Sequence, residues 1–163
     1  MTDILHVSAV LRCGPHKAYE MFTDNKLLES WLITPFSEGG HAEIEPVQGG
    51  KYELFWEPTD RENNSTIGCK VTAIQLDKIL AFDWKGPVEF KHFMNVADPL
   101  THVVVSFIPN SESPIASTEV HLIHSGWGNS PEWQKAREYF MHAWSGAFRN
   151  LEIIFNEHVT EIS

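Results

Sequence analysis

The sequence predicts an α+β fold in which a curved antiparallel sheet of six to seven strands packs against one long C-terminal helix. Three observations lead to this prediction. Short segments of β-forming residues, separated by turn residues, follow one another from residue 42 to residue 125. Two short helical segments lie between the first strand and the second. A single apolar stripe with helical spacing then runs from Pro131 to about Val159.

The first predicted strand is Ile4–Arg12, which contains neither Gly nor Pro and ends at a Cys-Gly-Pro turn. Pro15 suits the first turn of a helix, and apolar residues recur at helical spacing from there to Thr23. Asp24 then caps a second short helix that stops before Pro35. Both helices are amphipathic, so we expect them to pack on a larger apolar surface.

Six further strands are predicted from the alternation of apolar and polar residues. They are Ala42–Glu45, Gly50–Trp56, Ser65–Ile74, Ile79–Trp84, Thr101–Ile108 and Ser117–Ser125. Within these strands every second residue belongs to one apolar face, while the other face is mostly polar. The apolar face contains Tyr52, Leu54, Trp56, Leu80, Phe82, Trp84, Val103, Val105, Phe107, Val120, Leu122 and His124.

The long helix begins with Ser130 as its cap and Pro131 in the first helical position. At 1.5 Å per residue it would be about 43 Å long, enough to cover a whole sheet. Gly146 in its middle either permits a close backbone approach or faces solvent without consequence. The residues on its predicted inner face are Trp133, Ala136, Phe140, Trp144, Ala147, Leu151, Ile154 and His158.

Length and charge limit the classes of function. The 163 residues fit one domain over 1–163. The 12 basic and 22 acidic residues give a net charge of −10, which disfavours nucleic-acid partners. No apolar run is long enough to span a membrane, and no secretory signal is visible, so we expect a cytoplasmic protein. Cys13 and Cys69 are expected to be two free thiols in that compartment.

The sequence resembles the domain family named after the activator of the heat-shock-protein-90 ATPase. The likeness begins with VLRCGPHKAYEMFTDNKLLESWL, in which a Pro-started helix leads to a Thr-Asp step and a Trp. It continues in order through GGKYELFW, FDW, THVVVSFIP, TEVHLIHSGWG and HAWSGAFRNLEIIF, and so covers nearly the whole chain.

This resemblance implies the helix-grip fold, which is shared with START lipid-transfer domains, birch-pollen-allergen-like proteins and aromatic polyketide cyclases. It also implies a cavity between the sheet and the C-terminal helix. The segment from Lys85 to Leu100 is longer than the usual connection in this family, and its Phe90, Phe93 and Met94 make it a candidate lid.

Motifs for a metal, cofactor or nucleotide are not found. His121 and His124 are three residues apart on a predicted strand, so their side chains point to opposite faces and cannot chelate one ion. The sequence has no HExxH, no paired Cys and no Asp-rich loop. Its Gly-Gly pairs match neither phosphate-loop pattern. We therefore expect no metal and no cofactor.

The aromatic residues carry the main functional prediction. Six Trp residues are many for this length, and several fall on predicted inner faces, where they either fill the core or line a cup for a flat apolar ligand. The first hypothesis is a protein that binds an apolar or aromatic small molecule, with Tyr52 and His124 as polar handles. The predicted ligand-binding residues are Tyr52, Trp56, Phe82, Trp84, Phe93, Val105, His124, Trp127, Phe140 and Trp144.

Two alternatives stay open. In the second hypothesis the protein is a cofactor-free cyclase or hydrolase in which His124, alone or with Tyr52 or Glu53, acts as general acid or base. The other reading of His124 is a hydrogen-bonded structural residue, and we favour a binding protein over an enzyme. In the third hypothesis the protein binds a chaperone, and this ranks last because the sequence offers no separate chaperone-binding domain. A homodimer is left open.

Overall fold

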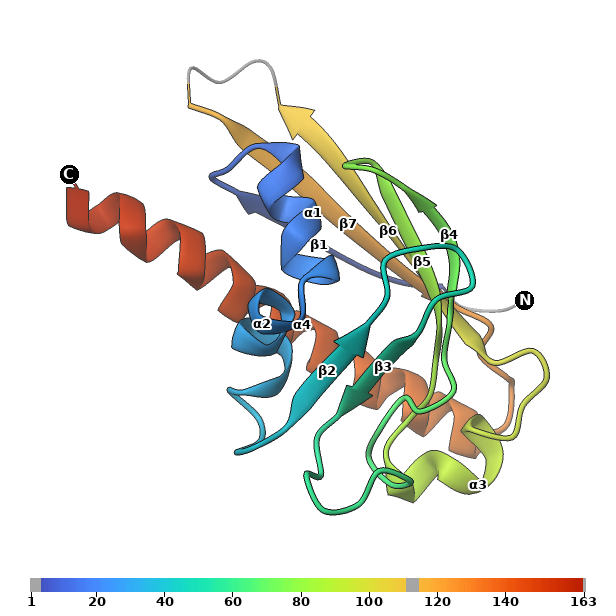
Figure 1. The fold of residues 1–163 in the computed structure, drawn as a ribbon. Helices are drawn as coiled ribbons and strands as arrows, with labels where there is room; N and C mark the ends of the chain where they lie inside the picture. The colour runs from blue at the N-terminus through green and yellow to red at the C-terminus, as the bar shows by residue number, and fades with distance from the viewer. Residues whose placement is uncertain (1–3, 111–114, 163) are drawn as a thin grey trace.

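The computed structural model describes residues 4–110 and 115–162, and the side chains of the last helix as far as Asn156. Seven strands and a long C-terminal helix form the architecture (Figure 1). The strands are β1 (Leu5–Leu11), β2 (His41–Ile44), β3 (Tyr52–Phe55), β4 (Val71–Gln75), β5 (Ile79–Trp84), β6 (Thr101–Asn110) and β7 (Ser117–Ser125). The helices are α1 (Pro15–Thr23), α2 (Asn25–Leu28), the π-helical turn η1 (Glu29–Ile33), the 3₁₀ turn η2 (Val88–Phe90), α3 (Lys91–Met94) and α4 (Pro131–Ile162).

The strands form one main antiparallel sheet and a hairpin. The main sheet has the order β1-β7-β6-β5-β4, and β2 pairs with β3. Isolated bridges from Lys51 to Lys70 and from Phe55 to Ser65 connect the hairpin with the segment that leads into β4. Each strand pairing is antiparallel, as predicted, and the architecture is the expected helix-grip fold.

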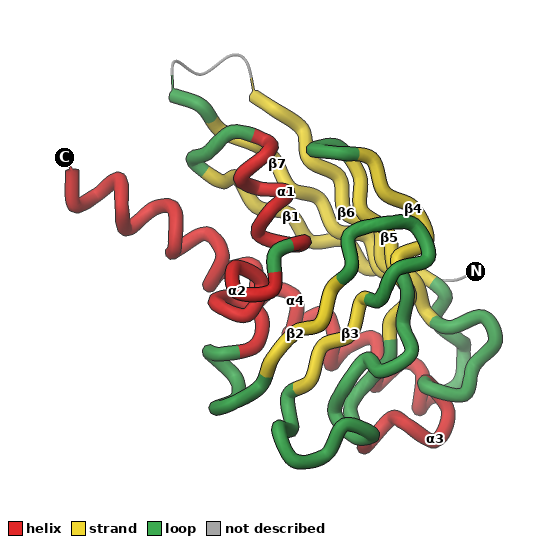
Figure 2. Tube along the Cα trace, viewed as in Figure 1, coloured by secondary structure: helices red, strands yellow, loops and turns green. Residues whose placement is uncertain are grey.

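The helices lie on the apolar face of the sheet. Figure 2 shows the helices in red and the strands in yellow. Phe22 of α1 makes an edge contact with Phe107 of β6. Trp31 of η1 makes an edge contact with Phe148 of α4, so α1, η1 and α4 meet in one core. The indole N–H of Trp31 donates to the backbone oxygen of Met21 at 2.8 Å, which satisfies the buried polar atom.

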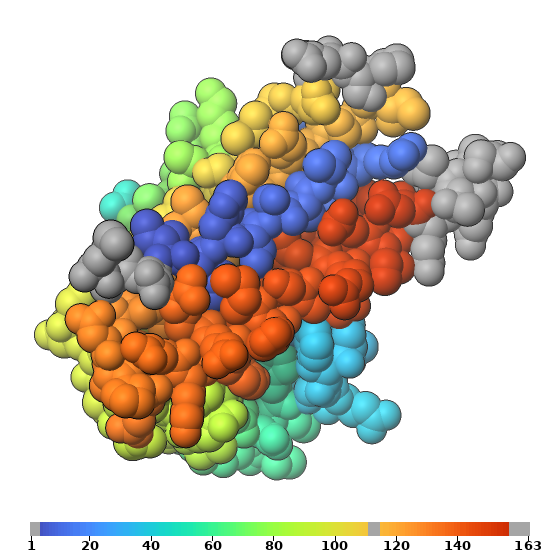
Figure 3. All heavy atoms as spheres, turned by 180° about the vertical axis from the view of Figure 1, so that it is seen from behind, coloured from blue at the N-terminus to red at the C-terminus, as the bar shows by residue number. Residues whose placement is uncertain are grey.

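The long helix α4 runs beside β1, as Figure 3 shows from behind. Its predicted inner face is confirmed for Ala136, Phe140, Trp144, Ala147 and Leu151, which are all buried, and Phe148 joins them. The prediction for Ile154 was wrong, because this part of α4 extends past the sheet and leaves the side chain 39% exposed. The predicted inner position of His158 lies outside the described side chains.

A Cβ atom added at Gly146 would meet nothing within 4 Å. Gly146 therefore does not permit a close backbone approach. Of the two interpretations from the sequence, the one that gives this glycine no packing role holds. Both cysteines are free thiols, as predicted. Among residues 4–110 and 115–162 no helix is both long enough and apolar enough to cross a membrane.

Candidate ligand-binding pocket

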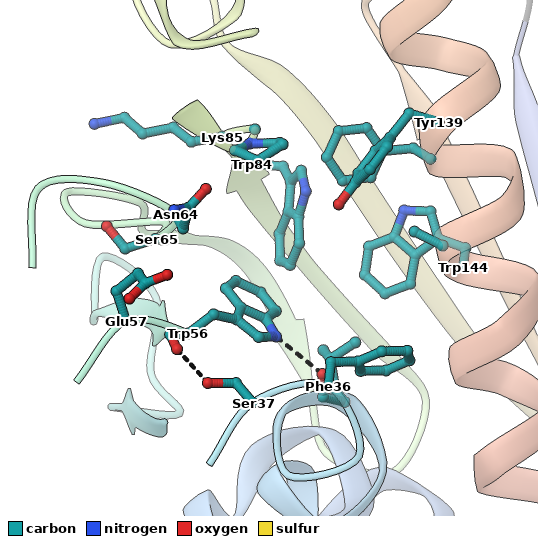
Figure 4. A pocket seen from close by; sticks show the side chains of 15 residues that line it. Phe36, Ser37, Trp56, Glu57, Asn64, Ser65, Trp84, Lys85, Tyr139 and Trp144 are labelled. Carbon is teal, nitrogen blue, oxygen red and sulfur yellow. Dashed lines mark hydrogen bonds between the residues drawn. The ribbon is translucent and has the colours of Figure 1, made fainter. Parts of the chain in front are cut away.

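A pocket of about 400 Å³ lies where the ends of β3 and β5 meet η1 and the first half of α4 (Figure 4). This volume falls within the range of about 300–1,000 Å³ that is usual for small-molecule sites. One wall is aromatic and comes from β3, β5 and α4, and the other is built from loops. The lining residues are Leu32, Phe36, Ser37, Trp56, Glu57, Asn64, Ser65, Trp84, Lys85, Gly86, Pro87, Tyr139, Phe140, Ala143 and Trp144.

Three tryptophans form the aromatic wall: Trp56 directly after β3, Trp84 at the end of β5 and Trp144 on α4. The ring of Trp84 lies 5.0 Å from that of Trp144 and 6.2 Å from that of Trp56, measured between centroids. The indole N–H of Trp56 donates to the backbone oxygen of Leu32 at 3.2 Å. These contacts fix the rings, so the wall is formed before any ligand arrives.

The indole N–H of Trp84 is the exception in this wall. Its nitrogen is buried and has no hydrogen-bond acceptor among the described residues. In Figure 4 the nitrogen edge of the ring is turned toward Tyr139 and Trp144 of α4. A buried donor without an acceptor costs about 1–3 kcal/mol of stability, and this nitrogen has almost no surface that a group in the cavity could reach.

His124 lies directly behind the aromatic wall and is completely buried. Its Nδ1 accepts the indole N–H of Trp144 at 3.1 Å, so Nε2 carries the proton and donates to the hydroxyl of Thr101 at 3.0 Å. The strand register explains this cluster, because Thr101 pairs with Trp84 and His124 with Val103. Burial, and to a lesser extent the charge of His102, lowers the pKa of His124 to about 3.

The loop wall carries the polar groups. The Ser37 hydroxyl donates to the backbone oxygen of Trp56, and the Ser65 hydroxyl donates to that of Arg61. The Lys85 ammonium group donates to the backbone oxygen of Ile67 at 2.6 Å and points away from the pocket in Figure 4. The carboxylate of Glu57, by contrast, makes no side-chain hydrogen bond or ion pair with the described residues.

The segment from residue 85 to residue 100 contributes Lys85, Gly86 and Pro87 to the pocket lining. The Asn95 side chain accepts from the backbone N–H of Gly86 at 2.7 Å and donates to its carbonyl oxygen at 3.0 Å. Phe90 makes an edge contact with Tyr139 of α4 at 5.4 Å between centroids. The segment is therefore an ordered cover over the first turns of α4.

The structure brings only part of the predicted ligand-binding set to the pocket. Trp56, Trp84, Phe140 and Trp144 line it. The other six lie elsewhere in the aromatic core or behind the wall: Tyr52, Phe82, Phe93, Val105, His124 and Trp127. The stacking of Tyr52 on Phe82 at 3.9 Å shows why, since side chains fill the middle of the predicted cup.

The Tyr52 hydroxyl donates to the backbone oxygen of Phe22 at 2.8 Å, so it does not act as a handle in the pocket. Phe93 packs its edge against Trp133 on the far side of the cover. His121 lies on the outer face and bonds His6 at 3.0 Å, which confirms that His121 and His124 point to opposite faces.

Sequence reasoning missed Tyr139 and Ala143 on α4. Their signal was available, because they lie one position before Phe140 and Trp144 and so flank the apolar stripe. The loop residues Phe36, Glu57 and Asn64 gave no signal, since loops have no periodicity from which a facing can be read.

Comparisons with known proteins place this chain in a family. The model of the family described as "Activator of Hsp90 ATPase homolog 1-like protein" matches residues 12–156. The chain belongs to this family. No curated protein matches the chain in sequence.

Solved structures support the fold of this Hsp90-ATPase-activator-like chain. A crystal structure of a protein from Mesorhizobium loti superposes with a TM-score of 0.68 at 17% identity, covering 95% of this chain and 98% of that one. The solution structure of an Aha1 dimer from Colwellia psychrerythraea gives a TM-score of 0.62 at 15% identity, with 94% and 96% covered. At such low identity these likenesses show the fold alone.

Proposed function

We propose that the protein binds an apolar or aromatic small molecule in the pocket between Trp56, Trp84, Trp144 and α4. The observation that carries this proposal is the pocket of about 400 Å³ itself, whose lining is mainly aromatic and apolar. Binding sites of this kind combine a mostly apolar lining with a few polar groups that fix orientation. The expected ligand therefore has a flat apolar body and a small polar group that reaches the loop wall.

We also propose that His124 is a structural residue and not a general acid or base. Both of its ring nitrogens are already engaged, by Trp144 and Thr101. Its low pKa keeps it neutral at physiological pH, and no solvent reaches it. A catalytic acid or base must reach a substrate atom within about 3.2 Å, which this geometry does not offer. Binding without catalysis thus has more support than the enzyme hypothesis.

The experiment is a titration with N-phenyl-1-naphthylamine, a neutral probe whose emission rises in an apolar site. Ala143 lines the pocket, whereas the adjacent His142 is exposed on α4. We expect Ala143→Trp to fill the pocket and weaken binding at least about tenfold, while His142→Trp adds the same bulk without effect. Equal binding by both variants would show that the probe does not occupy the pocket.

We propose that segment 85–100 acts as the lid of this pocket. The Asn95 clasp on Gly86 and the contact between Phe90 and Tyr139 support that role. A homodimer is proposed on the likeness to the Aha1 dimer from Colwellia psychrerythraea, and sedimentation equilibrium tests it. A chaperone partner stays the weakest proposal, since it rests on the family name.

A further inference from the structure

The charges around the pocket indicate which sign of ligand it takes, and this inference rests on the proposed function. Among the lining residues the charged side chains are Glu57 and Lys85. The ammonium group of Lys85 is held by the backbone oxygen of Ile67 and points away from the cavity. Glu57 has no such partner among the described residues, and in Figure 4 its carboxylate lies on the loop wall opposite Trp84. The lining thus carries one acidic and one basic side chain, and the Glu57 carboxylate is the one of the two that has no hydrogen-bond or ion-pair partner among the described residues.

The other cations near the loop wall are also engaged outside the pocket. Arg61 pairs with Glu43 at 2.7 Å. The ammonium group of Lys91 donates to the backbone oxygen of Glu62 at 3.0 Å and to the Asn63 side chain at 2.9 Å. No positive group among the described residues is thus left facing the cavity to receive an anion.

A second carboxylate, that of Glu89, adds to the negative potential on the Tyr139 side of the pocket. Burial, and then the negative charge of Glu89, raises the pKa of the Tyr139 hydroxyl, which lines the pocket. The protein as a whole carries a net charge of −10. A field of this sign attracts cations and repels anions.

The aromatic wall has the same preference. The faces of Trp, Tyr and Phe rings carry negative electrostatic potential, and a cation within about 6 Å of a ring centroid is attracted to it. Trp84 and Trp144 are tilted by 46° at 5.0 Å, and Trp56 stands edge-on to Trp84 at 76°. These three rings pack against one another, and Trp84 and Trp144 are each only 2% exposed. The lining rings that keep surface for a cation include the partly exposed Trp56 and Tyr139.

We propose that the natural ligand is an organic cation, an ammonium group on an apolar or aromatic body. The ammonium group lies between the Glu57 carboxylate and the rings of Trp56 and Tyr139, and the apolar body fills the space beside Phe140 and Ala143. Fatty acids and aryl carboxylates are thereby disfavoured, because Lys85, the cationic side chain of the lining, is held by the Ile67 oxygen and points away from the cavity.

The test uses three ligands of one shape and different charge, measured by calorimetry on the full chain at pH 7. They are 2-phenylethylammonium, 2-phenylethanol and 3-phenylpropanoate. We expect the ammonium compound to bind about tenfold more tightly than the alcohol, and the carboxylate to bind most weakly. Raising the salt concentration to about 0.5 M should reduce the preference for the cation.

Two charge variants locate the effect. Glu57→Gln should weaken the ammonium compound about three- to fivefold and leave the alcohol unchanged. Glu62→Gln, an exposed carboxylate on the same loop outside the lining, serves as the matched control and should change neither. Because both side chains are exposed, we expect both variants to fold.

Each outcome decides a point. The inference is overturned if the cation and the alcohol bind equally, if the carboxylate binds more tightly, or if Glu57→Gln leaves the preference for the cation intact. In each of these cases the binding function still stands. If no compound binds and N-phenyl-1-naphthylamine fails as well, the binding function itself is overturned.

Discussion

Acidification should destabilise this protein through His124. The residue is buried and neutral in the folded state, with a pKa of about 3, whereas the unfolded chain has the ordinary value of 6.5. Between these values the unfolded state binds one more proton than the folded state, so stability falls as the pH falls from about 6.5 toward 3. Above pH 6.5 the contribution of His124 to stability is complete.

The magnitude follows from the two pKa values. The linkage relation gives a loss in the free energy of unfolding of about 2 kcal/mol between pH 7 and pH 5. No charged side chain contacts His124 among the described residues. Its neighbours are Thr101, Trp84, Trp127, Phe140 and Trp144. The charge of His102 lowers the pKa further, but less than burial does. The loss is therefore almost entirely a cost of burying an imidazolium ion.

Urea denaturation at both pH values measures this loss, with His124→Gln as the comparison. Glutamine can accept from Trp144 and donate to Thr101 but does not titrate, so its loss should be smaller by about 2 kcal/mol. His16, whose pKa is raised mainly by its hydrogen bond to Asp77, acts in the opposite direction. Its contribution is common to both proteins and cancels.

Equal pH dependence in the two proteins would refute the reasoning. If His124→Gln does not fold, an NMR titration of the wild-type imidazole replaces it. We expect the His124 ring protons not to shift between pH 7 and pH 4.5. A midpoint near 6.5 would contradict the buried neutral state.

Three substitutions test the packing by urea denaturation. Gly146→Ala should stabilise the protein by about 0.5–1 kcal/mol, because helix propensity improves and the new methyl group meets nothing within 4 Å. Gly40→Ala should cost more than about 2 kcal/mol, since its Cβ would lie 2.6 Å from Ile33 Cγ2 and 2.7 Å from a backbone oxygen. Tyr52→Phe should cost about 1–3 kcal/mol, because it leaves the Phe22 oxygen without its donor. It should not change probe binding, and a loss of binding would show that Tyr52 belongs to the site.

The fold was predictable because its information is local and periodic. Alternation in Ile79–Trp84 and the stripe on α4 each specify which side of an element is buried, and the structure places those residues inside. The error at Ile154 has a physical reason. The stripe shows which face is apolar, but it does not show where the sheet beneath the helix ends.

The site was less predictable, because facing inward is not the same as facing a cavity. Tyr52 and Phe82 face inward as predicted, but they stack on each other at 3.9 Å and leave no space. Whether an inner position meets another side chain or a void depends on three-dimensional packing, which a single sequence does not encode locally. The polar rim is harder still, since Glu57 and Asn64 come from loops whose path depends on the folded neighbours.

Hydrogen bonding distinguishes Trp84 from four other tryptophans. Trp31, Trp56, Trp127 and Trp144 each donate their indole N–H to an acceptor within the protein. Trp84 is as deeply buried as Trp144, at 2% exposure each, yet its N–H has no acceptor among the described residues. Burial alone would treat both rings alike. Because an unsatisfied buried donor costs about 1–3 kcal/mol, the N–H of Trp84 lowers the stability of the aromatic wall, whereas the four hydrogen-bonded indoles do not carry this cost.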